Sequence, residues 1–232
     1  MPPAPATRAV WDLPSRLFHW LLVLACAGSY ITNRIGVEAF GLHVWCGCIV
    51  LVLVAFRIAW GFAGTRHARF ANFVVGPVRT FGYLRAMLRG RPPAVVGHNP
   101  LGAWMVLLLL AALATQALTG LAGNDGLFNF GPLYALVGKA QSRALTHVHK
   151  TLFWWIAGAA ALHVLAVLLH RLLWRESLVL PMFTGRKPAA LVPESEAIGG
   201  SRTWLALTIV LALAGLLALI LLNVPARTAS IT

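Results

Sequence analysis

The chain has 232 residues, of which 59% are hydrophobic and only 11% are charged. That is too little polar surface to cover a soluble globule, so the composition excludes one. Several apolar runs are instead long enough to cross a bilayer, which indicates a polytopic membrane protein. The net charge of +13 would suggest nucleic acid as the partner of a soluble protein. Here the lysines and arginines are distributed unequally between the two sides of the predicted membrane, which explains the charge as a topology signal. No nucleic-acid partner is therefore expected.

The apolar runs predict an all-α protein with five membrane-spanning helices. The spans are expected at about residues 17–32, 41–60, 101–121, 144–174 and 204–223. Residues 61–100 form a long connection rich in arginine, glycine and proline, and within it residues 78–89 are predicted to form an amphipathic helix at the membrane interface. The expected domains are a four-helix membrane domain (1–181), a polar linker (182–203) and a fifth transmembrane helix with a short tail (204–232).

The positions of the cationic residues predict the orientation. With the N-terminus in the cytoplasm, five of the 19 lysines and arginines lie outside and the other 14 lie inside. This is the positive-inside bias of a bacterial inner-membrane protein, with the C-terminus in the periplasm after five spans. Anionic lipid is expected as a secondary partner. The five outer residues are Arg34, Lys139, Arg143, Lys150 and Arg227.

Three histidines interrupt the apolar stretch HKTLFWWIAGAAALHVLAVLLH, which runs from His149 to His170. His149 and His163 are fourteen residues apart, so a helix leaves both side chains within roughly 40° of one face. The same spacing puts them about 21 Å apart along the axis, one near each edge of a hydrocarbon layer about 30 Å thick. A histidine is costly in lipid, so each of these needs a hydrogen-bond partner or a ligand.

The predicted orientation sorts four histidines into two pairs. His43 opens the second span and His149 the fourth, both at the outer face, while His19 and His163 lie toward the inner face. Two imidazoles at one depth suit the two axial positions of a haem iron that transfers electrons. We therefore predict two non-covalent haems b, with these four histidines as the iron ligands. A lone membrane histidine fits a hydrogen bond between helices equally well, and only the matched set favours haem.

Each haem carries two propionates that need cationic partners. Arg57 lies fourteen residues after His43, on the same helix face but at its inner end, and Arg16 is three residues before His19. Both arginines are candidates for the propionates of the inner haem, and snorkelling at the membrane boundary explains them as well. His170, two turns beyond the inner ligand of the fourth span, is a candidate for a quinone site or a propionate; interface anchoring is the alternative.

The remaining histidines and the cysteines are not expected to bind a metal. His147 lies off the face that His149 and His163 share, and His67 and His98 fall in or beside the inner connection, where they are expected to be solvated. The three cysteines all lie in apolar segments and are expected to be buried structural thiols. Their spacing excludes covalent haem attachment through C-x-x-C-H and provides no zinc motif.

Four parts of the sequence resemble the bacterial two-haem cytochromes b, that is, the cytochrome b561 group and the cytochrome b subunits of membrane nickel–iron hydrogenases. They are VWDLPSRLFHW, LHVWCG, GHNPLGAWMVLLLL and the His149–His163 pair, within about residues 8–181. The resemblance implies a four-helix haem core with His19, His43, His149 and His163 as axial ligands. It also implies electron exchange with the quinone pool. The fifth span and its linker lie outside this pattern.

The function expected from the sequence is electron transfer across the membrane between quinone or quinol and an outer-face redox protein. That partner is either a hydrogenase-like subunit or a cytochrome c. An electron-transfer subunit is favoured over a stand-alone oxidoreductase. One alternative is a superoxide:quinone oxidoreductase of the same fold, in which Lys139, Arg143 and Lys150 attract the anion. The other is a haem-free transporter or scaffold in which the histidines relay protons.

Overall fold

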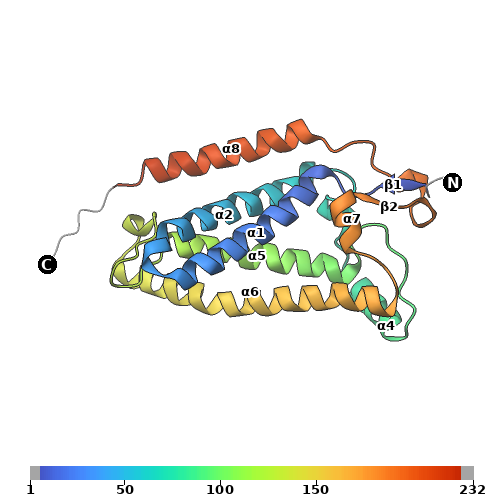
Figure 1. Cartoon of the computed structure of the whole chain (residues 1–232), viewed down its shortest axis with the longest axis horizontal. Coiled ribbons are helices and arrows are strands. Elements are labelled where there is room, and N and C mark those ends of the chain that lie inside the picture. The colour runs from blue at the N-terminus through green and yellow to red at the C-terminus, as the bar shows by residue number, and fades with distance from the viewer. Residues whose placement is uncertain (1–5, 226–232) are drawn as a thin grey trace. The chain divides into compact units, whose positions relative to one another are not determined.

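The structure is a computed structural model that describes residues 6–225, most of them helical (Figure 1). Long helices occupy the places of the predicted spans, and the chain is an all-α membrane protein. Among the described residues, four segments are long and apolar enough to cross a membrane: α2 with the short helix η1 (Val37–Ala39) before it, α5, α6 and α8. The long helices are α1 (Leu13–Ile35), α2 (Phe40–Ala63), α5 (Pro100–Leu121), α6 (Lys139–Leu173) and α8 (Thr203–Leu222).

The first predicted span differs from the others. α1 has 23 residues and is about 34 Å long, enough for the hydrocarbon layer. It is nevertheless missing from the four segments that are apolar enough by composition. The physical reason lies in its polar residues, which include Arg16 and His19 near its start and Asn33 and Arg34 near its end. That α1 crosses the membrane stays a prediction.

Contacts divide the chain into two compact units, each made from parts of several helices. Unit 1 extends to residue 19 and includes residues 57–109 and 159–207; unit 2 includes residues 20–56, 110–158 and the chain from residue 208. Each unit contains one of the two predicted histidine pairs. The predicted domain boundaries at residues 181 and 203 are a different division and stay a prediction.

In unit 1 the N-terminal segment pairs with the segment that was expected to be a linker. β1 (Thr7–Ala9) is antiparallel to β2 (Arg186–Pro188) (Figure 1). α7 (Val179–Thr184) ends at Gly185, whose φ of +77° is one that glycine adopts without strain. The Gly185 carbonyl accepts hydrogen bonds from two main-chain amides just after β1, at 2.9 and 3.0 Å. The linker therefore belongs to the fold of unit 1, and two short helices follow β2 in it: η3 (Ala189–Leu191) and η4 (Glu194–Glu196).

A buried carboxylate joins the start of α1 to the end of α2 within unit 1. Asp12 is 1% exposed. It accepts hydrogen bonds from the Ser15 amide at 2.7 Å, from the Trp60 indole at 3.3 Å and from the Thr65 hydroxyl. The bond from Ser15 caps α1 and satisfies a main-chain donor that the first helical turn leaves without a partner. Because a buried carboxylate is stable only when its oxygens are paired, this network holds the N-terminal end of α1 in place.

The connection between α2 and α5 contains two short helices, α3 (Phe70–Phe73) and α4 (Pro77–Leu88). α4 coincides with the predicted amphipathic helix. Its exposed apolar side chains include Val78, Phe81 and Leu88. Exposed apolar residues on an arginine-bearing helix are typical of a segment that lies in the membrane interface, so the structure supports that part of the prediction.

In unit 2 the loop after α5 is anchored to the first turns of α6. The Asn124 side chain donates to the Ser142 hydroxyl at 2.6 Å, and the Asn124 amide donates to the Thr146 hydroxyl at 2.8 Å. The loop continues through η2 (Tyr134–Leu136) before α6 begins. These contacts fix the part of α6 that precedes His149.

Candidate functional site

The outer pair of predicted ligands comes together in unit 2. His43 lies in the first turn of α2 and His149 lies in α6. Their rings lie in a T-shaped arrangement, with centroids 6.1 Å apart and ring planes at 81°. The Nδ1 atom of His43 is 2.9 Å from the main-chain oxygen of Ser29, and Nδ1 of His149 is 2.8 Å from that of Gln116.

These two contacts set the chemistry of the outer pair. A carbonyl oxygen accepts only from a protonated nitrogen, so Nδ1 carries the hydrogen in both rings and Nε2 has the lone pair. A metal-binding histidine usually has this arrangement, because the second hydrogen bond fixes the ring and strengthens the ligand. Gln116 and Ser29 act through the main chain, so no side-chain motif signals them in the sequence.

The inner pair comes together in unit 1 with nearly the same spacing. His19 lies in α1 and His163 in α6, with ring centroids 6.4 Å apart and ring planes at 59°. Between residues 6 and 225 there is no group of three or more His, Cys, Asp or Glu side chains that fits a metal ion. The metal ligands that these residues could supply are therefore the two pairs of imidazoles, which would suit the two axial positions of a macrocycle-bound iron.

The ring separations fit one iron between each pair. A metal–imidazole bond is about 2.0 Å long and the ring centre is roughly 1.1 Å beyond the nitrogen, so two axial imidazoles have centres about 6.2 Å apart. The observed 6.1 Å and 6.4 Å agree with this value. Each pair of histidines is therefore spaced as the axial ligands of a haem.

A cavity of about 330 Å³ adjoins the outer pair and lies wholly within unit 2. Both histidines line it. Gly47 and Gly120 also line it, and because glycine has no side chain they leave space in the cavity. A Cβ at Gly47 would meet nothing within 4 Å, whereas a Cβ at Gly120 would lie 2.7 Å from Cε1 of His149. The cavity thus combines both ligands, open space and hydrogen-bonding groups. Its polar lining residues include Asn33, Asn124, Thr146 and Lys150.

The two arginines predicted for the inner propionates have other contacts in unit 1. Arg57 is 4% exposed; its guanidinium donates to the Ala68 carbonyl at 3.1 Å and lies 5.2 and 5.8 Å from the ring centroids of Phe70 and Phe73. Arg16 donates to the Phe183 carbonyl. Arg57 is too buried for its guanidinium to reach the membrane surface by snorkelling. Its positive charge would compensate the charge of a buried anion beside it. Both arginines stay candidates for the propionates.

The predicted quinone ligand, His170, is buried near the end of α6. It is 6% exposed, and its Nδ1 lies 3.5 Å from a carboxylate oxygen of Glu176. The other oxygen of that carboxylate is 3.3 Å from the ammonium of Lys187, which is itself buried. Glu176 therefore lies between His170 and β2. The role of His170 in a quinone site stays a prediction.

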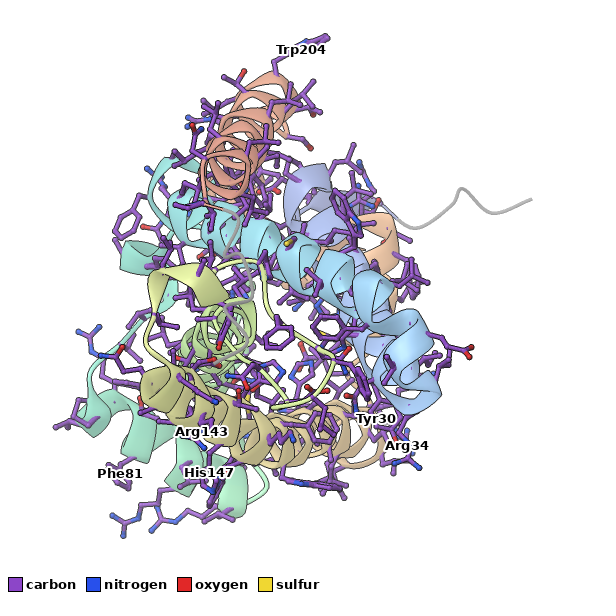
Figure 2. All side chains as sticks on the ribbon, turned by 90° about the vertical axis from the view of Figure 1, so that its left-hand side faces the viewer. Tyr30, Arg34, Phe81, Arg143, His147 and Trp204 are labelled. Atoms are coloured by element: carbon purple, nitrogen blue, oxygen red, sulfur yellow. The ribbon has the colours of Figure 1, made fainter. Side chains whose placement is uncertain are left out.

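The prediction that His67 and His98 are solvated was wrong. His67 is 7% exposed, and its Nε2 lies 2.8 Å from the main-chain oxygen of Glu196. His98 packs against Trp11 and Phe73, with ring centroids 4.8 and 4.4 Å away. Both lie in a polar stretch of sequence; the supposed linker covers His67 through Glu196, and Trp11 and Phe73 cover the half-buried His98. His147, by contrast, is exposed on α6 near Arg143 (Figure 2). Of the cysteines only Cys48 is buried, while Cys26 and Cys46 are half-buried.

Comparison with known proteins assigns a family to these features. The model of the family described as prokaryotic cytochrome b561 matches residues 10–185, which contain all four paired histidines. No solved structure matches the chain significantly.

Three relatives illustrate the similarity. A "Probable Ni/Fe-hydrogenase B-type cytochrome subunit" of Cupriavidus necator is 28% identical over 212 residues, which cover 76% of this chain and 85% of the relative. A protein of the same description from Rhodobacter capsulatus is 24% identical over 216 residues, covering 77% and 80%. A "Probable Ni/Fe-hydrogenase 1 B-type cytochrome subunit" of Escherichia coli K12 is 28% identical over 118 residues, covering 40% and 49%.

Proposed function

The chain belongs to the prokaryotic cytochrome b561 family, and on that premise we propose that it is a di-haem subunit that links the quinone pool to a nickel–iron hydrogenase at the outer face of the inner membrane. As a member of the family it is a haem b-binding membrane protein that transfers electrons. The number of haems, the quinone and the hydrogenase are the parts that we propose.

The observation that carries the proposal is the pair of neighbouring imidazoles in each unit, with ring centroids 6.1 Å and 6.4 Å apart. A bound haem b supplies a one-electron couple. Two histidines would hold each haem iron, which would leave no site for oxygen and would suit electron transfer. The carbonyls of Ser29 and Gln116 keep the outer rings oriented. α6 contributes one histidine to each pair.

The relatives support the choice of partner. Those with the highest coverage are described as hydrogenase cytochrome subunits. The exposed cations Lys139, Arg143 and Lys150 lie at the start of α6, which the predicted topology puts outside. A cationic surface near the outer pair favours docking of an acidic protein partner. A hydrogenase subunit that delivers electrons there would reduce the outer haem first.

The experiment uses the purified full-length chain. A pyridine haemochrome assay should find two haems b per chain, and a reduced-minus-oxidised spectrum should show the bands of low-spin haem. Addition of the copurified nickel–iron hydrogenase and H₂ should reduce both haems, and quinone should reoxidise them. A haem content of zero would favour a transporter or scaffold. Rapid quinone reduction driven by superoxide, with no response to H₂, would favour the superoxide alternative.

A further inference from the structure

The connection between α5 and α6 in unit 2 exposes two large apolar side chains that follow one another in the sequence. Leu127 and Phe128 are each 73% exposed, and Phe130, two residues later, is 47% exposed. Single apolar side chains on a surface are ordinary, whereas a group of them on one short loop marks a contact surface. None of the three is used by the two histidine pairs.

The Asp125 carboxylate fixes the conformation of this loop tip. One of its oxygens accepts hydrogen bonds from the main-chain amides of Leu127, Phe128 and Asn129, at 2.8, 2.9 and 3.0 Å. The other oxygen accepts from the Asn129 side chain at 2.7 Å. Gly126, with a φ of +83°, permits the tight turn between them. The tip is therefore pre-organised, which lowers the entropy cost of binding a partner.

The base of the loop lies on the outward side of His149. Asn124 is bonded to Ser142 and Thr146. These residues precede His149 by seven and three positions, which places them about 10 and 5 Å closer to the start of α6. The predicted topology puts His149 near the outer edge of the hydrocarbon layer, so the loop is expected beyond that layer. The ionised carboxylate of Asp125 beside the tip also opposes insertion into hydrocarbon.

The same loop adjoins the outer pair of histidines. Asp125 and Asn129 line the cavity of about 330 Å³ that His43 and His149 also line. A protein that contacts the loop tip would therefore lie beside the proposed site of the outer haem. An electron-transfer partner of that haem has to bind at such a place.

Exposed cations lie on the turns of α6 that hold the loop. Arg143 is exposed and follows Ser142, which is bonded to the loop. Lys150 is exposed and lines the cavity together with Asp125. An apolar centre with a polar rim is the usual composition of a protein–protein interface, and a cationic rim is complementary to a partner with surface carboxylates.

We propose that Leu127 and Phe128 form the apolar centre of the surface on which the outer redox protein docks, with Arg143 and Lys150 in its cationic rim. The complementary surface of the partner is an apolar hollow bordered by Asp or Glu side chains. The inference rests on the proposed electron transfer with a partner at the outer face, and it adds the residues that this partner contacts. The rim cations speed the encounter of the two proteins, and the apolar centre slows their dissociation.

The test measures reduction of the haems in the purified full-length chain by H₂ and the copurified nickel–iron hydrogenase, as a function of hydrogenase concentration at low and high salt. Phe128→Ser should raise the concentration for half-maximal rate about tenfold or more at both salt concentrations, as truncation of an aromatic anchor does. Arg143→Gln should weaken binding at low salt, and its difference from the wild type should vanish at high salt. Leu191→Ser, at a residue of unit 1 that is 58% exposed, is the control and should keep the wild-type dependence.

Photo-crosslinking separates a protein partner from lipid. A benzophenone amino acid in place of Phe128, in membranes that contain the hydrogenase, should form a covalent adduct with a hydrogenase subunit on illumination. Adducts with lipid alone would overturn the proposal and assign the loop tip to the outer surface of the bilayer.

Haem content and the midpoint potentials of both haems are recorded for every variant. Two haems with unchanged potentials and a weakened response to hydrogenase support the proposal. Wild-type dependence in both Phe128→Ser and the double variant Leu127→Ser/Phe128→Ser overturns it and leaves the proposed function standing. If Phe128→Ser loses a haem, Leu127→Ser decides. A wild-type chain whose two haems are reduced by dithionite but not by H₂ and hydrogenase overturns the proposed function together with the inference.

Discussion

Gly120→Ala is predicted to weaken the outer haem while it leaves the inner one in place. A Cβ at this position of α5 would lie 2.7 Å from Cε1 and 2.9 Å from Nδ1 of His149, closer than real Cβ atoms approach other heavy atoms. The ring would have to move by several tenths of an ångström. That movement disturbs both the 2.8 Å bond to the Gln116 carbonyl and the direction of Nε2 toward the iron.

Overpacking of this kind costs about 1–3 kcal/mol, which corresponds to a loss of about 5- to 150-fold in affinity for the outer haem. The assay is haem content after dilution and washing of the purified protein, with the two haems distinguished by their midpoint potentials. Gly215→Ala is the matched control, because a Cβ there would meet nothing within 4 Å. Two fully retained haems with unaltered potentials in Gly120→Ala would refute the assignment of His149 as a ligand held from α5.

Three more predictions follow from the paired rings, the buried network and the charge distribution. Alanine at His43 or His149 should remove one haem and alanine at His19 or His163 the other, by pyridine haemochrome; loss of both or of neither contradicts the pairing. Asp12→Ala should lower the free energy of unfolding by about 2–4 kcal/mol, because it leaves buried donors without an acceptor. Glu38→Ala, at an exposed carboxylate, is its control, with an effect below about 1 kcal/mol in a denaturation experiment. A C-terminal alkaline phosphatase fusion should be active, and a fluorescent C-terminal green fluorescent protein fusion would show that one of the five segments does not cross.

The helices and the ligand pairs were predictable because they depend on local periodicity. Apolar runs set the helices to within a few residues, and the fourteen-residue spacing of His149 and His163 fixed their common face whatever the helices pack against. Pairing then needed only the depth of each histidine. The structure reproduces both pairs, with ring separations that an iron atom would span.

The surroundings of the pairs were not predictable, because they depend on contacts between distant segments. Asp12 finds its partners 48 and 53 residues away, at Trp60 and Thr65. The supposed linker pairs with the N-terminal strand through β2, across about 180 residues of sequence, and so covers His67. Main-chain acceptors, such as the carbonyls of Ser29 and Gln116, carry no side-chain signature at all.

The histidines of this chain differ in what lies beside Nδ1, and this difference bears on the role predicted for each. In His43 and His149 a carbonyl holds Nδ1, which turns Nε2 into a donor for a metal. In His170 a carboxylate oxygen of Glu176 lies 3.5 Å from Nδ1, which has no hydrogen-bond partner among the described residues. In His98 no described residue satisfies Nδ1, while the ring is bonded to the main chain of His67. A buried nitrogen left in that state costs stability unless a partner pairs with it.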